Sequence, residues 1–377
     1  MIRSWRARLL AAGTAGIALV AAPAAAADFD TAAADALVRR LMAAEAVPGA
    51  ALALIKDGKI VLQRGYGLRD LASRAPVTTA TLFNIGSISK SFTALAVAEL
   101  VDRHRLALDA PVVRYLPALR LRDARTAQAL TLRQLLSHTS GYPADGAWPR
   151  QVPPTRAGIV GEFAAMPPDA EPGMRFQYCS RCIVLAAAVL EQVTGQSWEA
   201  YVRAQIFAPL GMHAATFGPR GLADAPDRAQ PYGHDPVLGA VPWSRLQDLE
   251  PLAPAGGIDA DIADMAAYAL FQFGDGTFAG RRLLSAAMLA ELHRPEIAVG
   301  ADWTPAAGRE DLHYALGWFT AEPRGLPVIL HNGANPGFRA AILLAPSLKA
   351  GVVVLSNGES SRFTEAATRG LLEQVVE

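Results

Sequence analysis

A serine and a lysine three residues apart, Ser87 and Lys90, are the residues whose types and spacing most directly suggest chemistry. On a helix, residues three apart lie on the same face, so the lysine amine can reach the serine hydroxyl. A serine hydroxyl becomes a good nucleophile when a base takes its proton, and a lysine is such a base when neutral. Burial and nearby positive charge lower the pKa of lysine by several units from about 10.4. The pair therefore indicates a serine nucleophile activated by an unprotonated lysine.

The choice of lysine at position 90 is informative in this chain. Lysine and arginine together number 35, and the lysines among them are Lys56, Lys59, Lys90 and Lys349. Arginine cannot act as the base, because it stays protonated up to pH ~12. A position that needed only charge or packing would be expected to carry arginine here. Chance alone yields Ser-x-x-Lys in roughly one such chain in six, so the pair needs support from other motifs.

Motifs of several other mechanisms are missing from the sequence. No Gly-x-Ser-x-Gly occurs, since the nearest candidate, residues 195–199, lacks its last glycine. None of the seven histidines is followed by glutamate, so the His-Glu-x-x-His zinc motif is absent. There is neither a phosphate-binding loop nor a dinucleotide fingerprint. These absences favour the lysine-assisted serine.

Cys179 and Cys182 are the two cysteines of the chain. In an oxidising compartment such a pair forms a small disulfide, and the alternatives are free thiols or a metal or redox site. A zinc site needs two further ligands, and no His or Cys pair at ligand spacing is evident. The disulfide is therefore the favoured alternative.

The composition bounds the function. A length of 377 residues with 51% hydrophobic and 19% charged residues is sufficient for a large buried core. The net charge is zero and the pI about 7.1, which argues against a nucleic-acid partner.

The N-terminus resembles an export signal. Three arginines lie within the first eight residues, residues 9–20 are apolar, and Ala25 to Ala27 fit a small-residue cleavage site. We expect residues 1–27 to be a signal peptide and the mature protein to be periplasmic or secreted, without a stable membrane span. The alternative is a short membrane anchor.

Strands are expected at both chain ends, with helices between them. Asp57-Gly58 lies between apolar runs and predicts a hairpin over residues 50–67. Ser89 and Ser91 are expected to cap a helix or face solvent. Further strands are predicted at 314–320, 327–331, 338–344 and 351–355, and helices at 91–102, 132–137, 183–193, 198–207, 262–271 and 362–376.

These elements predict an α/β fold of the α+β type. One antiparallel sheet from both chain ends is flanked by helices, and a mainly helical subdomain at roughly 100–270 is inserted into a domain covering 28–377. Gly195 and Gly211 stand where helices are expected to end.

The segment FNIGSISKSFTA resembles the active-site block of serine β-lactamases and penicillin-binding proteins. It is most similar to the branch of class C β-lactamases, D-alanyl-D-alanine carboxypeptidases and family VIII esterases. The resemblance runs in order from about residue 40 to about residue 358 and implies a β-lactamase/transpeptidase-like fold. Further blocks with the same resemblance lie at 130–143, 171–212, 254–268, 312–319 and 329–338.

The resemblance implies a catalytic group of three residues. Ser87 would be the acylated nucleophile, Lys90 its base, and Tyr178 a proton shuttle between serine and leaving group. The shuttle role suits a phenol whose pKa is lowered by the neighbouring lysine. The alternative for Tyr178 is a tyrosine that packs at a helix start. His138 is expected to have a structural hydrogen-bonding role.

The block HNGA implies a strand that lines the site. His331 would help to position Tyr178 or bind a substrate carboxylate, unless it is an ordinary strand histidine. Gly333 would let the substrate backbone lie close along the strand. The backbone N–H groups of Ser87 and Ala334 would form the oxyanion hole.

One position departs from the family pattern. Two residues after Tyr178 the family usually has an asparagine that orients the substrate's acylamide group, and this chain has Ser180. A hydroxyl lacks the amide's fixed donor–acceptor pair, so Ser180 weakens the case for a dedicated β-lactamase. Cys179 and Cys182 would fix this loop if they form a disulfide.

The resulting expectation is an exported serine hydrolase of esters, amides or β-lactams. Its partners would be small-molecule or peptide substrates with a carbonyl centre, with no metal or organic cofactor. The alternative is a penicillin-binding or sensor protein that is acylated without efficient turnover.

We predict that Ser87→Ala abolishes labelling by a fluorophosphonate while the fold remains. Lys90→Arg should reduce labelling nearly as much, because arginine does not become neutral. Substantial labelling of Lys90→Arg would show that position 90 does not supply the base.

Overall fold

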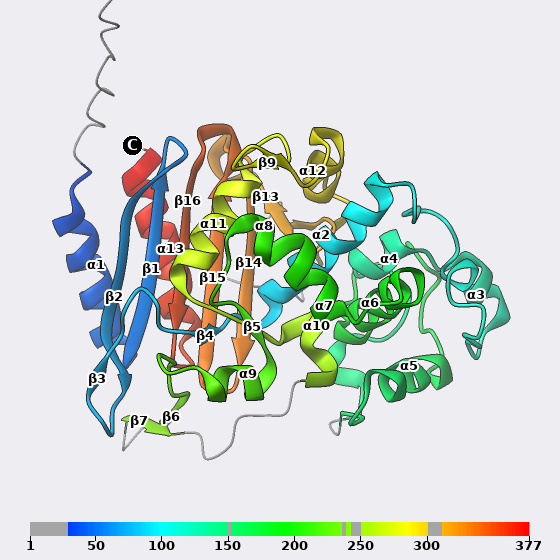
Figure 1. Cartoon of the computed structure of the whole chain (residues 1–377), viewed down its shortest axis with the longest axis horizontal. Coiled ribbons are helices and arrows are strands. Elements are labelled where there is room, and N and C mark those ends of the chain that lie inside the picture. Colours follow the sequence, from blue (N-terminus) through cyan, green and yellow to red (C-terminus); the bar gives the residue numbers. More distant parts are fainter. Residues whose placement is uncertain (1–28, 150–151, 236–238, 243–249, 301–310, 377) are drawn as a thin grey trace, which may run out of the picture. The chain divides into compact units, whose positions relative to one another are not determined.

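The computed structural model describes residues 29–149, 152–235, 239–242, 250–300 and 311–376 (Figure 1). The predicted signal peptide, residues 1–27, lies outside the described residues. Within them, no helix has the length and apolar character needed to cross a membrane.

The hairpin predicted at the N-terminal end forms around Asp57-Gly58. Both residues have a positive φ, 53° and 71°, which a tight turn between twisted strands requires. The turn joins β1 (Gly49–Lys56) to β2 (Lys59–Asp70) in antiparallel pairing. On its other edge β1 pairs with β16 (Ala350–Ser356), so the two ends of the chain meet inside one sheet.

The sheet has nine strands in the order β11-β12-β13-β14-β15-β16-β1-β2-β3, and its neighbouring strands are antiparallel. This confirms the predicted fold class. The remaining strands of the sheet are β3 (Ala75–Pro76), β11 (Ile297–Ala298), β12 (His313–Tyr314), β13 (Phe319–Ala321), β14 (Val328–Asn335) and β15 (Phe338–Ala345).

The single strand predicted at 314–320 is wrong. The segment forms β12 and β13, joined by a tight turn in which Ala315 N–H donates to the Trp318 carbonyl at 2.7 Å. Gly317 has a φ of 77°, and a Cβ there would lie 3.0 Å from the Lys90 carbonyl oxygen. The strand breaks because its backbone packs directly onto the helix that carries Lys90.

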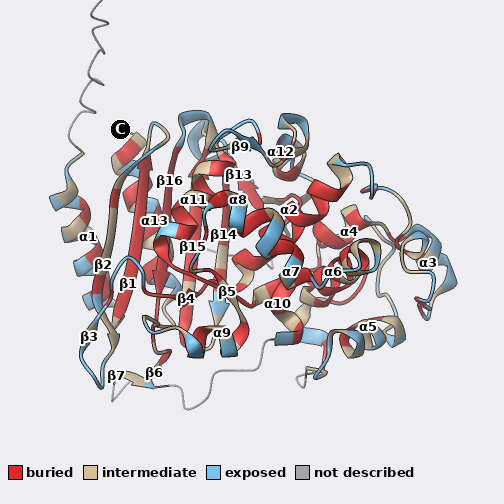
Figure 2. Cartoon of the chain, in the orientation of Figure 1, coloured by how far each residue is buried: buried red, intermediate tan, exposed pale blue. Residues whose placement is uncertain are grey.

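Helices cover the sheet on both sides. α13 (Ser361–Val376) packs on β15 and β16, with α1 (Thr31–Ala44) against it, and α11 (Ile262–Gln272) packs on β1, β2 and β16. Successive strand residues point to opposite faces, so Ala51 and Ala53 join the core cluster that contains α11, whereas Leu52 between them does not. Both faces of β1 are therefore buried, as Figure 2 shows.

The described residues between α2 (Ser89–Asp102) and β11 contain helices α3 to α12 and only short strands. Gly195 and Gly211 end helices in the left-handed conformation, as predicted. The predicted helix at 198–207 continues as a π-helical turn over Arg203–Phe207. The other helices are α3 (Ala124–Ala129), α4 (Leu132–Leu136), α5 (Arg156–Ala165), α6 (Ser180–Thr194), α7 (Trp198–Val202), α8 (Ala208–Leu210), α9 (Gly218–Asp224), α10 (Ala253–Gly256) and α12 (Ala286–His293).

Among the described residues, seven short strands lie outside the main sheet and pair among themselves. They are β4 (Phe83–Asn84), β5 (Thr216–Phe217), β6 (Tyr232–Asp235), β7 (Gly239–Pro242), β8 (Ile258–Ala260), β9 (Thr277–Phe278) and, paired with β9, β10 (Arg281–Arg282).

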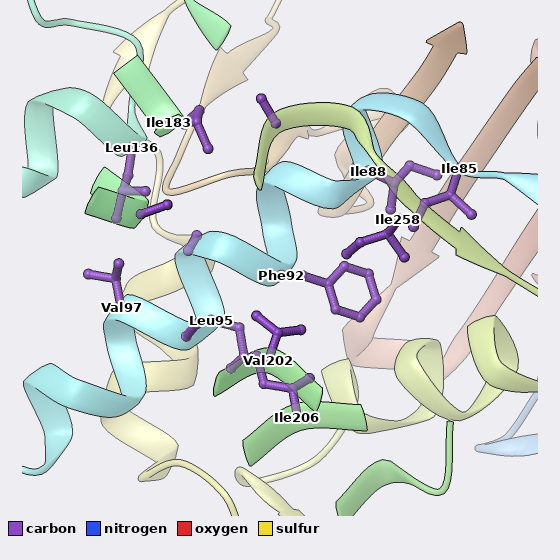
Figure 3. Packing of buried hydrophobic residues seen from close by; sticks show 14 of the residues in the cluster. Ile85, Ile88, Phe92, Leu95, Val97, Leu136, Ile183, Val202, Ile206 and Ile258 are labelled. Carbon is purple, nitrogen blue, oxygen red and sulfur yellow. The ribbon is translucent and has the colours of Figure 1, made fainter. Parts of the chain in front are cut away.

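α2 is buried on every side from Ser89 to Leu100 (Figures 2 and 3). Ser89 and Ser91 therefore do not face solvent, contrary to expectation. The Ser89 hydroxyl donates to the Gly86 carbonyl at 2.7 Å and accepts from Ile258 N–H at 3.1 Å. The Ser91 hydroxyl accepts from the Tyr268 hydroxyl at 2.8 Å. The two serines connect α2 to β8 and α11.

We predict that Phe92→Ala lowers the free energy of unfolding by about 3–5 kcal/mol, because it leaves a cavity in the core. Phe92 is fully buried and stacks on Tyr268, with ring centroids 3.8 Å apart. Ile60, which is 41% exposed, is the control, and Ile60→Ala should stay within about 0.5 kcal/mol. The free energy of unfolding is measured by urea denaturation. An equal decrease for Phe92→Ala and Ile60→Ala would contradict this account of the core.

Candidate active site

Ser87 lies in a single 3₁₀ turn, η1 (Gly86–Ile88), between β4 and α2. α2 begins two residues after Ser87, at Ser89, and thus two residues before the predicted start at residue 91. Ser87 is half-buried, and every other residue from 81 to 100 is buried. The fold therefore presents this one residue of a buried segment to an incoming molecule.

Lys90 Nζ lies 3.0 Å from Ser87 Oγ and donates to the Ala255 carbonyl of α10 at 2.8 Å. The side chain is buried, with 1% exposure. Burial lowers the pKa of Lys90 to about 8, while the negative charge of Asp145 acts in the opposite direction. In its neutral form the amine can accept the Ser87 hydroxyl proton. The predicted serine–lysine geometry is present.

Tyr178, in the segment before α6, completes this group. Lys90 Nζ lies 4.6 Å from the Tyr178 ring centroid, and the Tyr178 hydroxyl is hydrogen-bonded to the Ser87 side chain. Burial raises the pKa of Tyr178, and the Ser87 hydrogen bond only partly offsets this rise. The lowered pKa expected for Tyr178 is therefore wrong: desolvation outweighs the neighbouring lysine, which carries no charge when neutral. Tyr178 is a phenol at neutral pH.

His331 on β14 lies behind this group. Its Nδ1 is 2.7 Å from the Asn332 carbonyl, which can only accept, so Nδ1 carries the proton. Nε2 then accepts from the Tyr314 hydroxyl at 3.1 Å. Burial, with the charge of Lys90 adding to it, lowers the pKa of His331 to about 3. A neutral imidazole with both nitrogens bonded is unsuited to bind a carboxylate, and its ring centroid lies 6.5 Å from that of Tyr178.

The strand β14 and the nucleophile turn approach each other closely. A Cβ at Gly333 would lie 1.9 Å from the Ile85 carbonyl oxygen, and a Cβ at Gly86 would lie 2.6 Å from Ala334 N. Gly86 also has a φ of 53°. Gly333 is thus required by the protein's own backbone, in addition to any role beside substrate. Ala334 N–H is placed next to the turn that carries Ser87, as an oxyanion hole requires.

A buried network that the sequence analysis missed holds this arrangement. Asn84 Oδ1 accepts from Gly86 N–H at 3.0 Å and from Asn335 Nδ2, and Asn84 Nδ2 donates to Asp259 Oδ1 at 2.9 Å. Asn335 Nδ2 also donates to the Gly256 carbonyl at 2.8 Å. Burial raises the pKa of Asp259 well above its usual range. The network joins the turn, the end of β14 and β8, and no local motif marks its members.

Ser180 is the first residue of α6, and both of its polar groups bind Asp145. Its N–H and its hydroxyl each donate to the Asp145 carboxylate at 2.7 Å. Asp145 N–H in turn donates to the Tyr178 carbonyl at 2.8 Å. The hydroxyl at the position of the family's substrate-orienting asparagine is therefore bonded to a carboxylate. Asp145 was not among the predicted site residues.

Cys179 and Cys182 form a disulfide at the start of α6. Cys179 N–H donates to His138 Nδ1 at 3.1 Å, and the His138 carbonyl accepts from Gln177 N–H at 2.7 Å. The His138 ring lies 4.4 Å from the Tyr178 ring, centroid to centroid. Burial lowers the pKa of His138 well below its usual value. His138 thus has the structural hydrogen-bonding role expected for it, supporting the segment that carries Tyr178.

The chain is similar in sequence to known proteins. The family model described as Beta-lactamase matches residues 34–376. The chain belongs to this family. Penicillin-binding protein 4 of Amycolatopsis lactamdurans is 32% identical over 333 residues, which cover 85% of this chain and 84% of that protein. Protein flp of Staphylococcus aureus is 26% identical over 88% of this chain, which spans 63% of flp.

Solved structures agree with this assignment. The octameric penicillin-binding protein homologue from Pyrococcus abyssi superposes with a TM-score of 0.78 at 27% identity, covering 92% of this chain and 78% of that one. SurE superposes with a TM-score of 0.74 at 25% identity, covering 91% and 75%. The chain thus shares its fold with a penicillin-binding protein homologue and with SurE.

We predict that the rate of nucleophilic attack by Ser87 rises with pH through about 8 and then levels off. The neutral amine of Lys90 is the active form, so well below its pKa the rate should fall about tenfold per pH unit. Labelling by an uncharged fluorophosphonate between pH 6 and pH 10 measures this, with Ser87→Ala as the blank. A rate that does not change over this range would exclude Lys90 as the titrating base.

Proposed function

We propose that this protein is an exported serine hydrolase that forms an acyl-enzyme on Ser87 and hydrolyses an ester, amide or β-lactam carbonyl. The observation that carries the proposal is the 3.0 Å separation between Ser87 Oγ and the buried Lys90 Nζ. Membership of the β-lactamase family supports the same reaction class. Export rests on the signal-like residues 1–27.

Acylation begins when neutral Lys90 accepts the Ser87 hydroxyl proton. Ser87 Oγ then bonds to the substrate carbonyl carbon, and the carbonyl oxygen becomes an oxyanion that accepts from the N–H groups of Ser87 and Ala334. The bond to the leaving group breaks, and the leaving group takes a proton from Tyr178. The Lys90 ammonium returns a proton to Tyr178.

In deacylation, water takes the place of the leaving group, and the proton transfers through Lys90 and Tyr178 occur in the opposite direction. Water loses a proton to the lysine–tyrosine pair while its oxygen bonds to the acyl carbon. Ser87 Oγ leaves the carbon and is reprotonated, so the net reaction consumes one water and yields an acid and the leaving group. Because burial keeps Tyr178 protonated, it acts as a relay that gives one proton and receives another.

The site favours a general ester or peptide over a β-lactam as the substrate. Ser180 offers no amide pair, and its hydroxyl is already bonded to Asp145. A fixed donor–acceptor pair for an acylamide group is thus missing at this position. The proposal therefore ranks an esterase or peptidase above a dedicated β-lactamase.

A second candidate is a penicillin-binding or sensor protein that is acylated without efficient turnover. It is favoured by the 32% identity to the protein named Penicillin-binding protein 4. Both candidates use Ser87, so they differ in the fate of the acyl-enzyme.

We predict Ser87-dependent turnover when p-nitrophenyl esters, nitrocefin and D-Ala-D-Ala peptides are compared on the mature protein. Hydrolysis of at least one substrate, lost in Ser87→Ala, supports the hydrolase. A stable penicillin label on Ser87 without turnover would support the second candidate instead. No label and no turnover would contradict both.

A further inference from the structure

We propose that the Asp145 carboxylate binds a positively charged group of the substrate, so the preferred substrates are esters or amides that carry a protonated amine. The proposal rests on the proposed function, because it concerns the same site. It assigns Asp145 a role in specificity.

Asp145 is held rigidly beside the catalytic group. Its carboxylate accepts both hydrogen bonds of Ser180 at the start of α6, and its N–H donates to the carbonyl of Tyr178. The residue itself is half-buried, and the next two residues, Gly146 and Ala147, are exposed. A carboxylate has about four acceptor sites, and the Ser180 bonds occupy one on each oxygen. Acceptor capacity therefore remains for a ligand.

The charge of Asp145 reaches the reacting groups. It raises the pKa of Lys90 and that of Tyr178, and no other carboxylate in the described residues is a cause of either shift. An ammonium on a substrate whose carbonyl lies at Ser87 would be subject to the same field. The effect on Lys90 also means that removing the charge should lower the pKa of Lys90.

Above the Lys90 pKa of about 8, in the active form of the site, positive charge does not balance Asp145 from the surrounding described elements. His331 on β14 is neutral, with both ring nitrogens bonded. Lys90 is neutral when it acts as base. Arg181, next to Ser180, pairs with Glu162 and lies over the Trp148 ring at 4.7 Å. A substrate cation is therefore favoured in this site and a substrate carboxylate is disfavoured.

Asp145 also stabilises the N-terminus of α6, where a carboxylate is favourable. A purely capping role would change the rates of all substrates alike when Asp145 is replaced. A binding role changes the ratio between charged and neutral substrates. This difference separates the two roles.

The test compares kcat/KM for p-nitrophenyl esters of 6-aminohexanoate, hexanoate and adipate, which have similar length and positive, zero and negative charge. The wild type should favour the amino ester over the neutral ester by about tenfold and disfavour the adipate ester. Asp145→Asn should remove this preference. In the same variant, the fall of kcat/KM for the neutral ester at low pH should begin at a lower pH than in the wild type. The exposed Glu171→Gln is the matched control and should keep the preference.

The outcomes distinguish this inference from the proposed function. Ser87-dependent hydrolysis with equal kcat/KM for amino and neutral esters in the wild type would overturn the inference and leave the hydrolase intact, and this comparison needs no variant. A preference that survives Asp145→Asn would also overturn it. Absence of Ser87-dependent turnover of every ester, of nitrocefin and of the D-Ala-D-Ala peptides would overturn the hydrolase, and the inference with it.

Discussion

The structure depends on burying the amine of Lys90 among uncharged partners. Nζ bonds to a serine hydroxyl and a backbone carbonyl, and α2 is enclosed on every side. An ammonium there lacks a directly bonded carboxylate, so burial favours the neutral form. The amine becomes a base only because helices and strands from distant parts of the chain exclude water from it. Placing Lys90 on a surface helix would restore an ordinary ammonium.

The same burial acts on the other titratable groups of the site. It lowers the pKa of His331 and of His138 and raises that of Tyr178. In each case the neutral form of the side chain is favoured, because desolvation destabilises the charged form. The two imidazoles and the phenol of the site are thus neutral at neutral pH. Asp145, which is half-buried, is the described carboxylate whose charge acts on Lys90 and Tyr178, and this is the basis for the charge preference proposed for the substrate.

Backbone contacts set the geometry in which these groups act. Gly333 and Gly86 allow β14 to approach the nucleophile turn more closely than any side chain permits. The Asn84 network then fixes the turn to β14 and β8. The sheet contains strands from both ends of the chain. The Ser87 hydroxyl and the Ala334 N–H, which are far apart in sequence, therefore lie in one site. These contacts fix the positions of the Ser87 and Ala334 N–H groups, which can then stabilise a developing negative charge without rearrangement.

The sequence by itself determined the features that depend on near neighbours in the chain. These are the hairpin at Asp57-Gly58, the glycine ends of two helices, and the family blocks around Ser87, Tyr178 and His331. Tertiary structure decided the split of the strand at Gly317, the burial of Ser89, and the raised pKa of Tyr178. It also decided the placing of Asp145 and Asn84 beside the site. The reason is physical: turn and helix signals act over a few residues, whereas desolvation and electrostatic fields come from segments that only folding brings together.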